Sequence, residues 1–183
     1  KKNKIEHISG SASFIDNKTI LVQSAKEEKK LSAKNFIIAT GSSSIEIPSM
    51  PIDEKQIVTS TGALSLQSVP KSMLVVGGGY IGLEMGSVWS RLGTKVTVVE
   101  ALDRIVPTMD GEIASNFMKA LQKQGIEFKL SHKVNNAKIN KDNVEVSIES
   151  PEKKELKEKF EIVLMSVGRK PNSEGLNLEK IGV

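Results

Sequence analysis

The feature that most constrains the fold of this chain is a glycine-rich turn placed directly after a short apolar run. Residues 73–84 read Met-Leu-Val-Val-Gly-Gly-Gly-Tyr-Ile-Gly-Leu-Glu and contain the spacing Gly77-x-Gly79-x-x-Gly82. A buried strand, a tight turn and a helix start in this order are typical of a dinucleotide-binding unit. Gly77 allows the turn, Gly79 allows the backbone to approach a pyrophosphate, and Gly82 lets the helix pack closely on the strand. The pattern predicts that peptide N–H groups and the positive helix end face the phosphates.

An acidic residue after the next apolar run indicates which dinucleotide is bound. Glu100 lies eighteen residues beyond Gly82 and ends the run 95–100. A carboxylate at this position can accept hydrogen bonds from both hydroxyls of the adenosine ribose. A 2′-phosphate would meet a like charge there, so NAD is favoured over NADP. Among the residues that follow Glu100 directly, Arg104 is the only nearby cation.

The residues after the glycine turn have the spacing of an amphipathic helix. We expect this helix to end at Gly93, and we expect Trp89 and Met85 to pack in the core rather than contact a ligand. Glu84 has two interpretations, because it can face the cofactor groove or simply favour the positive helix end. The apolar stripe consists of Ile81, Met85, Val88, Trp89 and Leu92.

Periodicity also predicts the elements that follow. Residues 111–124 read as a second helix that ends at Gly125, and 126–130 read as a third strand. Two or three strands of alternating polarity continue to about residue 160, and 162–168 read as another buried strand. The apolar residues of the second helix are Ile113, Phe117, Ala120 and Leu121.

Two elements are expected before the glycine unit. Residues 5–22 alternate like an antiparallel ribbon that turns at Asp16 and Asn17. Residues 36–41 read as a short buried strand that ends in glycine. A stretch rich in serine and proline follows, which is typical of a linker.

Composition excludes several classes of function. The 183 residues carry a formal net charge of +4 and include no cysteine, so they cannot build a disulfide, a cysteine nucleophile or a thiolate metal site. Lysines alternate with glutamates and there is one Trp and one Tyr, which argues against a nucleic-acid partner. No apolar run approaches a membrane span, so no membrane partner is expected. His7 and His132 lack metal-ligand spacing and are interpreted as surface or strand histidines, and no metal site is predicted.

A series of short motifs carries a resemblance to a known family. In this order the motifs resemble the central third of an enzyme of the pyridine nucleotide–disulphide oxidoreductase family of flavoproteins, and the resemblance runs through nearly the whole chain. The motifs are Ile38-Ala-Thr-Gly-Ser42, Thr61-Gly-Ala-Leu64, residues 76–86, Ser87-Val-Trp89, Arg91-Leu-Gly93, residues 96–100 and Ser166-Val-Gly-Arg-Lys-Pro-Asn172.

The resemblance implies a set of cofactor contacts. The NAD pyrophosphate and nicotinamide side would lie along 77–84, the adenosine ribose at Glu100, the adenine edge at Val134 and the nicotinamide half at 166–169. Part of an FAD site would lie near Ala12 and Thr40. By residue, the NAD site implied is Gly77, Gly78, Gly79, Tyr80, Ile81, Gly82, Glu84, Glu100, Val134, Ser166, Val167, Gly168 and Arg169, and the partial FAD site is Ala12, Thr40, Gly41 and Ser42.

The fold class expected is α/β. It is a Rossmann-like NAD-binding domain with a mostly parallel sheet, helices and an antiparallel β-meander, flanked by pieces of an FAD-binding domain. The resemblance places FAD-domain pieces at 1–47 and 168–183, a linker at 48–70 and the NAD-binding domain at 71–167.

The resemblance also implies a reaction for the longer enzyme. Such an enzyme oxidises protein-bound dihydrolipoamide through a redox disulfide and FAD and reduces NAD, with lipoyl domains of 2-oxo acid dehydrogenase complexes and a second copy of itself as partners. The family's cysteine pair, its FAD glycine motif and its His–Glu couple do not occur here. We therefore expect this chain to bind NAD(H), to be inactive alone and not to retain FAD. The bacterial cytoplasm is the expected compartment, ahead of the mitochondrial matrix.

Two alternatives stay open. The chain can be the NAD-binding domain of another flavin disulfide reductase or of an NADH oxidase. It can also be a non-catalytic module that binds NAD without hydride transfer. The residues upstream in a longer protein would separate these possibilities, because the redox enzyme needs two cysteines there.

Overall fold

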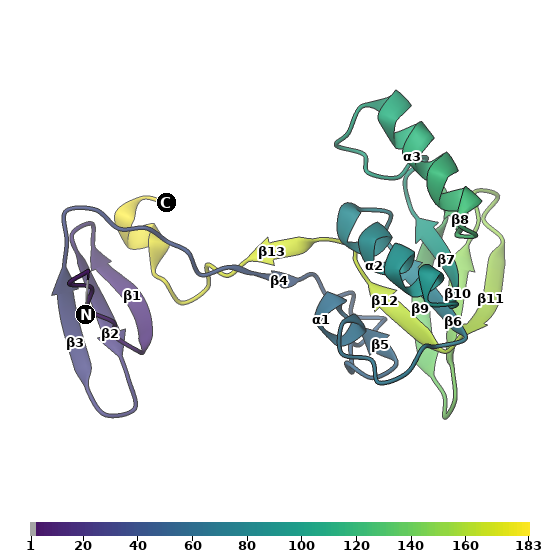
Figure 1. The fold of residues 1–183 in the computed structure, drawn as a ribbon. Coiled ribbons are helices and arrows are strands. Elements are labelled where there is room, and N and C mark those ends of the chain that lie inside the picture. Colours follow the sequence, from purple (N-terminus) through teal and green to yellow (C-terminus); the bar gives the residue numbers. More distant parts are fainter. Residues whose placement is uncertain (1–2) are drawn as a thin grey trace. The chain divides into compact units, whose positions relative to one another are not determined.

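The structure is a computed structural model that describes residues 3–183. The chain forms two compact units (Figure 1). The larger unit is Ser44–Lys170, and the smaller unit combines the residues up to Ser43 with Pro171–Val183. The two short strands β4 (Ser42–Ser44) and β13 (Arg169–Pro171) pair with each other where the chain passes from one unit to the other.

A five-stranded parallel sheet is the centre of the larger unit. Its strands are continuous apolar runs because both faces of the sheet are covered. Met73 and Val75 pack on one face and Leu74 and Val76 on the other, all at most 5% exposed. In spatial order the strands are β5 (Ile57–Val58), β12 (Ile162–Met165), β6 (Ser72–Val76), β7 (Lys95–Glu100) and β8 (Glu127–Leu130).

Helices cover the face of the sheet that includes Met73 and Val75 (Figure 1). They are α1 (Ser60–Ala63), α2 (Tyr80–Arg91) and α3 (Gly111–Lys123). The predicted second helix is confirmed as α3, and Asp110 caps it by accepting hydrogen bonds from the N–H groups of Glu112 and Ile113. No helix within residues 3–183 is long and apolar enough to cross a membrane.

The apolar stripes of the two long helices are only partly buried. Trp89 packs in the core as expected, whereas Val88 and Leu92 of the predicted α2 stripe are exposed. The buried face of α2 is instead formed by Gly82, Leu83, Gly86 and Trp89. On α3, Leu121 is buried, but Ile113, Phe117 and Ala120 are exposed. The prediction that these segments are helices was therefore correct. Which face of each helix is buried depends on where the sheet lies.

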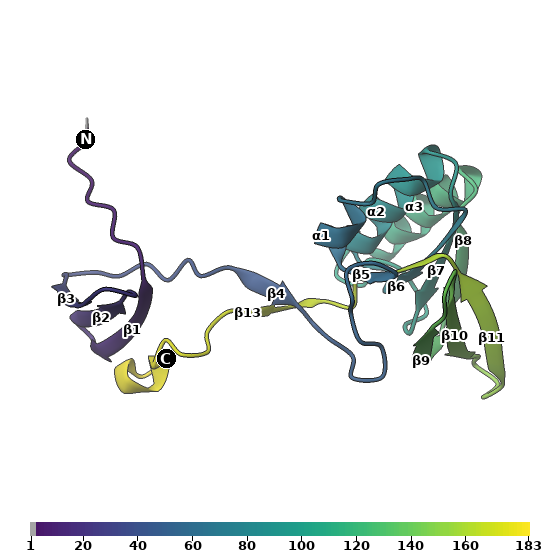
Figure 2. The same cartoon turned by 90° about the horizontal axis from the view of Figure 1, so that it is seen from below.

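An antiparallel meander covers the opposite face of the sheet, as predicted. It consists of β9 (Lys133–Ile139), β10 (Val144–Glu149) and β11 (Glu155–Phe160), in the order β11-β10-β9. Val146 and Ile148 of β10 are fully buried in the same cluster as Leu74 and Val99 of the sheet. The larger unit thus has three layers, helices, parallel sheet and meander, as Figure 2 shows from a second side.

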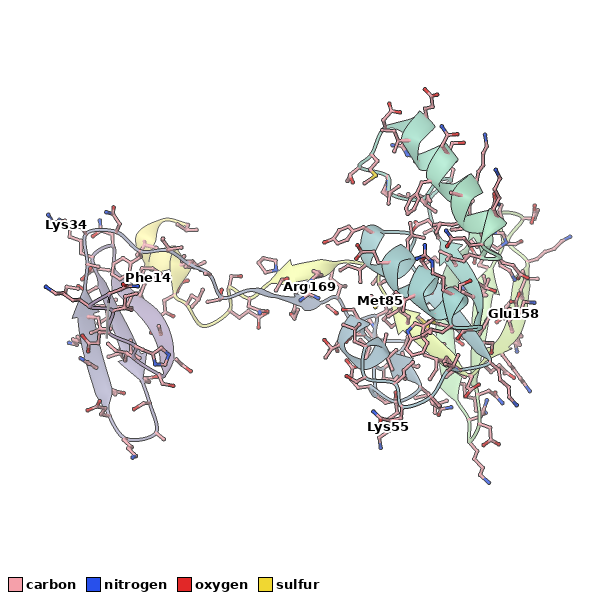
Figure 3. The ribbon with its side chains drawn as sticks, viewed as in Figure 1. Phe14, Lys34, Lys55, Met85, Glu158 and Arg169 are labelled. Atoms are coloured by element: carbon pink, nitrogen blue, oxygen red, sulfur yellow. The ribbon has the colours of Figure 1, made fainter. Side chains whose placement is uncertain are left out.

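An ion pair and the segment 48–70 complete the larger unit. Lys129 of β8 forms an ion pair with Glu158 of β11, which Figure 3 labels. The segment 48–70, expected to be a linker, supplies β5 and α1 to the larger unit, and its Met50 is completely buried. This segment therefore takes part in the core rather than spanning open solvent.

The smaller unit contains the predicted ribbon. Strands β1 (Ser11–Asp16) and β2 (Thr19–Gln23) pair antiparallel, and β3 (Glu28–Ser32), which was not expected, extends them. Phe14 of β1, labelled in Figure 3, is buried and makes an edge-to-face contact with Phe36 at 5.3 Å between ring centroids. A short 3-10 helix, η1 (Leu178–Ile181), completes the unit.

The predicted buried strand at 36–41 is wrong in this structure. The segment is irregular, and Ile37 is 93% exposed. A strand forms only when a neighbour accepts and donates its backbone hydrogen bonds, and within residues 3–183 no strand is paired with this segment. Its apolar sequence alone could not provide that partner.

A pH-dependent contribution to stability comes from the loop before β5. One carboxylate oxygen of Asp53 accepts hydrogen bonds from the N–H groups of Lys55, Gln56 and Ile57, each at 2.9 Å. Burial raises the pKa of Asp53, but these backbone donors outweigh it and hold the pKa below its ordinary value of 3.8. A carboxyl whose pKa is lowered on folding stabilises the fold above its unfolded-state pKa and loses that effect as the pH falls through the folded value.

We therefore predict that Asp53→Asn lowers the free energy of unfolding by about 1 kcal/mol at pH 7, a value reduced for solvent screening. The difference in free energy of unfolding between variant and wild type should become smaller below pH 3.8. Urea unfolding, followed by the fluorescence of Trp89, the single tryptophan, measures the free energy of unfolding at each pH. Asp142→Asn, an exposed carboxylate, is the control. A difference in free energy of unfolding that is the same at pH 7 and below pH 3.8 would contradict the prediction.

Candidate dinucleotide-binding site

The turn between β6 and α2 needs glycine at two positions because other backbone lies against it. Gly77 has a φ of +103°, and a Cβ added there would meet the carbonyl oxygen of Ser166 at 2.6 Å. A Cβ on Gly82 would meet the carbonyl oxygen of Gly77 at 2.6 Å. These contacts agree with the predicted roles of Gly77 in the turn and of Gly82 in close packing.

Gly79 is different because its neighbourhood is open. A Cβ added there would meet no atom within 4 Å. Gly79 is also the N-cap of α2 and provides no side-chain cap, so the first N–H groups of the helix keep their hydrogen-bonding capacity. An anion can therefore approach the backbone and the positive helix end here.

Glu100 is held beside this turn by backbone donors. Its carboxylate accepts the N–H of Gly78 at 2.6 Å through one oxygen and the N–H of Leu102 at 2.8 Å through the other. Each oxygen keeps a second lone pair, so the group can still accept hydrogen bonds from two hydroxyls. The carbonyl of Gly78 in turn accepts the N–H of Val106, which joins the loop after β7 to the glycine turn.

A cavity of about 260 Å³ lies against Glu100 in the larger unit. It brings together four residues from separate predicted motifs: Gly77, Glu100, Val134 and Val167. They meet because β6, β7 and β12 are parallel neighbours whose carboxyl ends share one edge of the sheet. The complete lining is Ile47, Val76, Gly77, Val99, Glu100, Ala101, His132, Lys133, Val134 and Val167.

His132 and Lys133 were missed as site residues by the sequence reasoning. The N–H of His132 donates to the carbonyl of Glu100 at 3.0 Å, so the turn between β8 and β9 is fixed to the end of β7. Arg104, the cation noted just after Glu100 in the sequence, donates to the carbonyl of Pro107, whereas Lys133 lines the cavity. The available signal in the sequence was their position just after the predicted strand 126–130, and the pairing of that strand, β8, with β7 is what places its end beside Glu100.

Ser166 and its neighbours lie under and beside the glycine turn. The hydroxyl of Ser166 donates to the carbonyl of Val76 at 2.8 Å and lies 3.1 Å from the carbonyl of Gly77, so it supports the turn from below. Val167 lines the cavity, and Gly168 has a φ of +130°. Arg169, labelled in Figure 3, is exposed at the start of β13.

The remaining predicted residues of α2 lie away from the cavity lining. Tyr80 is exposed and Ile81 is half-buried. Glu84 is exposed and lines a separate hollow together with residues of α2 and α3, among them Arg91 and Phe117. The structure thus brings Glu84 near the outer surface of the helices and not into the cavity beside Glu100.

The residues proposed for FAD lie in the smaller unit. Ala12 and Thr40 line a cavity of about 110 Å³. The hydroxyl of Thr40 donates to the carbonyl of Asn172 at 2.6 Å, and the N–H of Asn172 donates to the carbonyl of Gly41 at 3.0 Å. Ser42 begins β4.

Comparison with known proteins agrees with this geometry. Residues 1–183 match the family model described as pyridine nucleotide-disulphide oxidoreductase. The chain belongs to this family. The resemblance found in the sequence is thereby confirmed.

Similar proteins of the family are much longer than this chain. The chain is 51% identical to the mitochondrial dihydrolipoyl dehydrogenase of Schizosaccharomyces pombe, over all of this chain and 36% of that protein. It is 47% identical to the mitochondrial dihydrolipoyl dehydrogenase of Pisum sativum, over all of this chain and 37% of that protein. The chain therefore spans little more than a third of these relatives.

A solved structure of the family has the same fold. LpdA from Mycobacterium tuberculosis superposes with a TM-score of 0.83 and 26% sequence identity, over 96% of this chain and 39% of that one. The α/β fold class with a parallel sheet and antiparallel strands is confirmed.

The packing around the glycines leads to a prediction. Gly82→Ala should lower the free energy of unfolding by about 1–3 kcal/mol, because its methyl group would overlap the carbonyl of Gly77 and the hydroxyl of Ser166. Gly79→Ala should change it by less than about 0.5 kcal/mol, since nothing lies nearby. Urea unfolding followed by Trp89 fluorescence compares the two matched variants. An equal loss in free energy of unfolding for Gly82→Ala and Gly79→Ala would contradict the prediction, because the two glycines would then have the same packing role.

Proposed function

We propose that the larger unit binds NAD(H) at the carboxyl edge of its parallel sheet. The observation that carries the proposal is the open space at Gly79 next to a carboxylate, Glu100, which backbone donors hold in place. The first feature suits a pyrophosphate and the second suits a ribose with two free hydroxyls. Gly77, which begins the same turn, and Glu100 both line one cavity, so a single dinucleotide can reach the turn and the carboxylate together.

Each part of the dinucleotide then has a proposed position. The pyrophosphate lies on Gly77, Gly78, Gly79, Tyr80, Ile81 and Gly82, the adenosine ribose on Glu100, the adenine edge on Val134, and the nicotinamide half near Glu84, Ser166, Val167, Gly168 and Arg169. The hydroxyl of Ser166 already donates beneath the turn, so Ser166 is proposed to act by supporting Gly77 rather than by touching the ring. Tyr80 is proposed to contact the phosphates through its backbone N–H, because its side chain is 64% exposed.

The chain's own residues are proposed to bind and orient the dinucleotide. Gly79 admits the phosphates to the helix N-terminus, and Glu100 accepts the ribose hydroxyls while fixing Gly78. NAD is proposed over NADP because a 2′-phosphate would have to approach the Glu100 carboxylate.

We further propose that the longer protein is a dihydrolipoyl dehydrogenase. The support is the 51% and 47% identity to relatives of that name over all of this chain. Such an enzyme oxidises protein-bound dihydrolipoamide and reduces NAD, with FAD as the resident group that passes electrons between them. The cysteine-free residues 1–183 supply no redox disulfide, so the chain by itself is proposed to be inactive.

Partners and compartment follow from the same similarity. Lipoyl domains of 2-oxo acid dehydrogenase complexes and a second copy of the longer protein are the proposed partners. The relatives' names place those proteins in mitochondria, so we propose a mitochondrial location for this one. This proposal departs from the compartment expected from the sequence alone, which was the bacterial cytoplasm.

Replacement of Glu100 tests the ribose assignment. Glu100→Ala should weaken NADH binding by about 1–3 kcal/mol, because the ribose hydroxyls lose a charged acceptor. Wild type should bind NADH more tightly than NADPH, and the variant should show a smaller difference. Isothermal titration calorimetry with both dinucleotides measures these affinities. Glu179→Ala, an exposed carboxylate of the smaller unit, is the control, and unchanged NADH affinity in Glu100→Ala would remove Glu100 from the site.

Replacement of Gly79 tests the pyrophosphate assignment. Gly79→Val should weaken NADH binding by more than about tenfold, or 1.4 kcal/mol, because its side chain fills the space that the phosphates need. The same calorimetric titration measures the loss, and Trp89 fluorescence shows that the variant is folded. Gly79→Ala should lie between wild type and the valine variant. Full NADH affinity in folded Gly79→Val would make the phosphate assignment wrong.

A further inference from the structure

Val106, in the loop after β7, has a backbone conformation that valine rarely adopts. Its φ is +39°, in the left-handed region that disfavours a residue branched at Cβ. Such strain persists only where the surroundings impose it, and it is common at functional sites. The side chains of Val106 and its neighbour Ile105 are both buried in the core on the helix side of the sheet. The carbonyl of Val106 also accepts the N–H of Met109 at 2.9 Å, so the loop is held on both sides of the strained residue.

The backbone of Val106 directs one donor at the glycine turn. Its N–H donates to the carbonyl of Gly78 at 2.9 Å. In a trans peptide the C=O and the following N–H point in opposite directions, and the peptide bonds of residues 3–183 include no cis bond. The N–H of Gly79 therefore points away from Val106. Among the described residues this N–H has no hydrogen-bond partner, so it is available to a ligand.

The opposite orientation of this peptide is accessible because both of its residues are glycine. A flip of the peptide between Gly78 and Gly79 rotates φ of Gly79 by about 180°, from −77° into the positive range. Glycine adopts that range readily, whereas alanine does not. The flipped peptide presents the carbonyl oxygen of Gly78, in place of the N–H of Gly79, to an anion at the start of α2. A carbonyl oxygen repels phosphate oxygens, so the flip opposes phosphate binding.

We propose that Val106 is a positioning residue for the dinucleotide, because its N–H holds the peptide in the orientation that offers the N–H of Gly79 to the pyrophosphate. The inference rests on the proposed function, since it assumes that the pyrophosphate lies on the glycine turn. Glu100 does not have this role, because its carboxylate accepts the N–H of Gly78, which belongs to the preceding peptide. The strain at Val106 thus serves to place a donor on a peptide that two glycines leave free to rotate.

A backbone ester at Val106 tests this role, because it replaces the N–H by an oxygen and keeps the side chain. Proline would also remove the N–H, but its φ near −65° is far from +39°. The ester variant of the 183-residue chain should bind NADH about three- to tenfold more weakly in isothermal titration calorimetry, the factor that one backbone hydrogen bond provides. An ester at Asn140 is the matched control, since it removes an N–H that donates to Asn143 at 2.8 Å between β9 and β10. This control should bind NADH like wild type.

Combination with Gly79→Ala separates positioning from a merely structural role. Alanine at this position disfavours the flipped peptide by itself. The Val106 ester should therefore weaken NADH binding much less in Gly79→Ala than in wild type. Urea unfolding followed by Trp89 fluorescence establishes that each variant is folded.

NMR spectroscopy reports the orientation of the peptide directly. A flip changes the distances from the amide hydrogen of Gly79 to the α-hydrogens of Gly78. In the absence of ligand, the nuclear Overhauser effects between these hydrogens should differ between wild type and the Val106 ester. In wild type itself, NADH should move the amide resonance of Gly79 downfield, as expected when an N–H donates to a phosphate oxygen.

The outcomes distinguish this inference from the proposed function. Full NADH affinity in the folded Val106 ester would overturn the role of Val106 and leave the NAD(H) site in place. An equal loss of affinity in the wild-type and Gly79→Ala backgrounds, or unchanged nuclear Overhauser effects, would also overturn it. A Gly79 amide resonance that NADH leaves unmoved in wild type would overturn it without any variant. Wild type that binds no NADH would overturn the proposed function and this inference together.

Discussion

The parallel register of β12, β6, β7 and β8 is the constraint on which the site depends. Hydrogen bonding in this register places Met165, Val76, Glu100 and Leu130 at one edge of the sheet, although they are spread over ninety residues of sequence. The glycine turn, the Glu100 carboxylate and the turn before β9 all lie at that edge. A sheet with another strand order would contain the same motifs without assembling a cavity between them.

The three layers of the larger unit hold this register. Helices bury Met73 and Val75 on one face of β6, while the meander buries Leu74 and Val76 on the other. Because both faces of the sheet are covered, water cannot reach the backbone of the central strands. Their backbone hydrogen bonds therefore go to the neighbouring strands. The meander also delivers Val134 to the cavity, so its packing in the core and its part in the site have the same origin.

Three hydrogen bonds accepted by Glu100 connect the glycine turn, the loop after β7 and the turn before β9. Its carboxylate accepts hydrogen bonds from the N–H groups of Gly78 and Leu102, so binding of the proposed ribose would cost little free energy for orienting it. The carbonyl of the same residue accepts the N–H of His132 and thereby positions the turn that lines the cavity. Glu100 thus holds the glycine turn and the turn before β9 together at this edge of the sheet.

The sequence alone determined the features that depend on local chemistry. The spacing of Gly77, Gly79 and Gly82 indicated the turn, the apolar runs indicated the buried strands, and the carboxylate at Glu100 indicated NAD, because each reflects a period or a contact within a few residues. The tertiary structure decided what depends on distant neighbours. It brought His132 and Lys133 beside Glu100, turned Ile113 and Phe117 outward, and left residues 36–41 without strand pairing. The physical reason is that burial and backbone pairing are properties of two segments in contact, whereas the periodicity of one segment records only its own preferences.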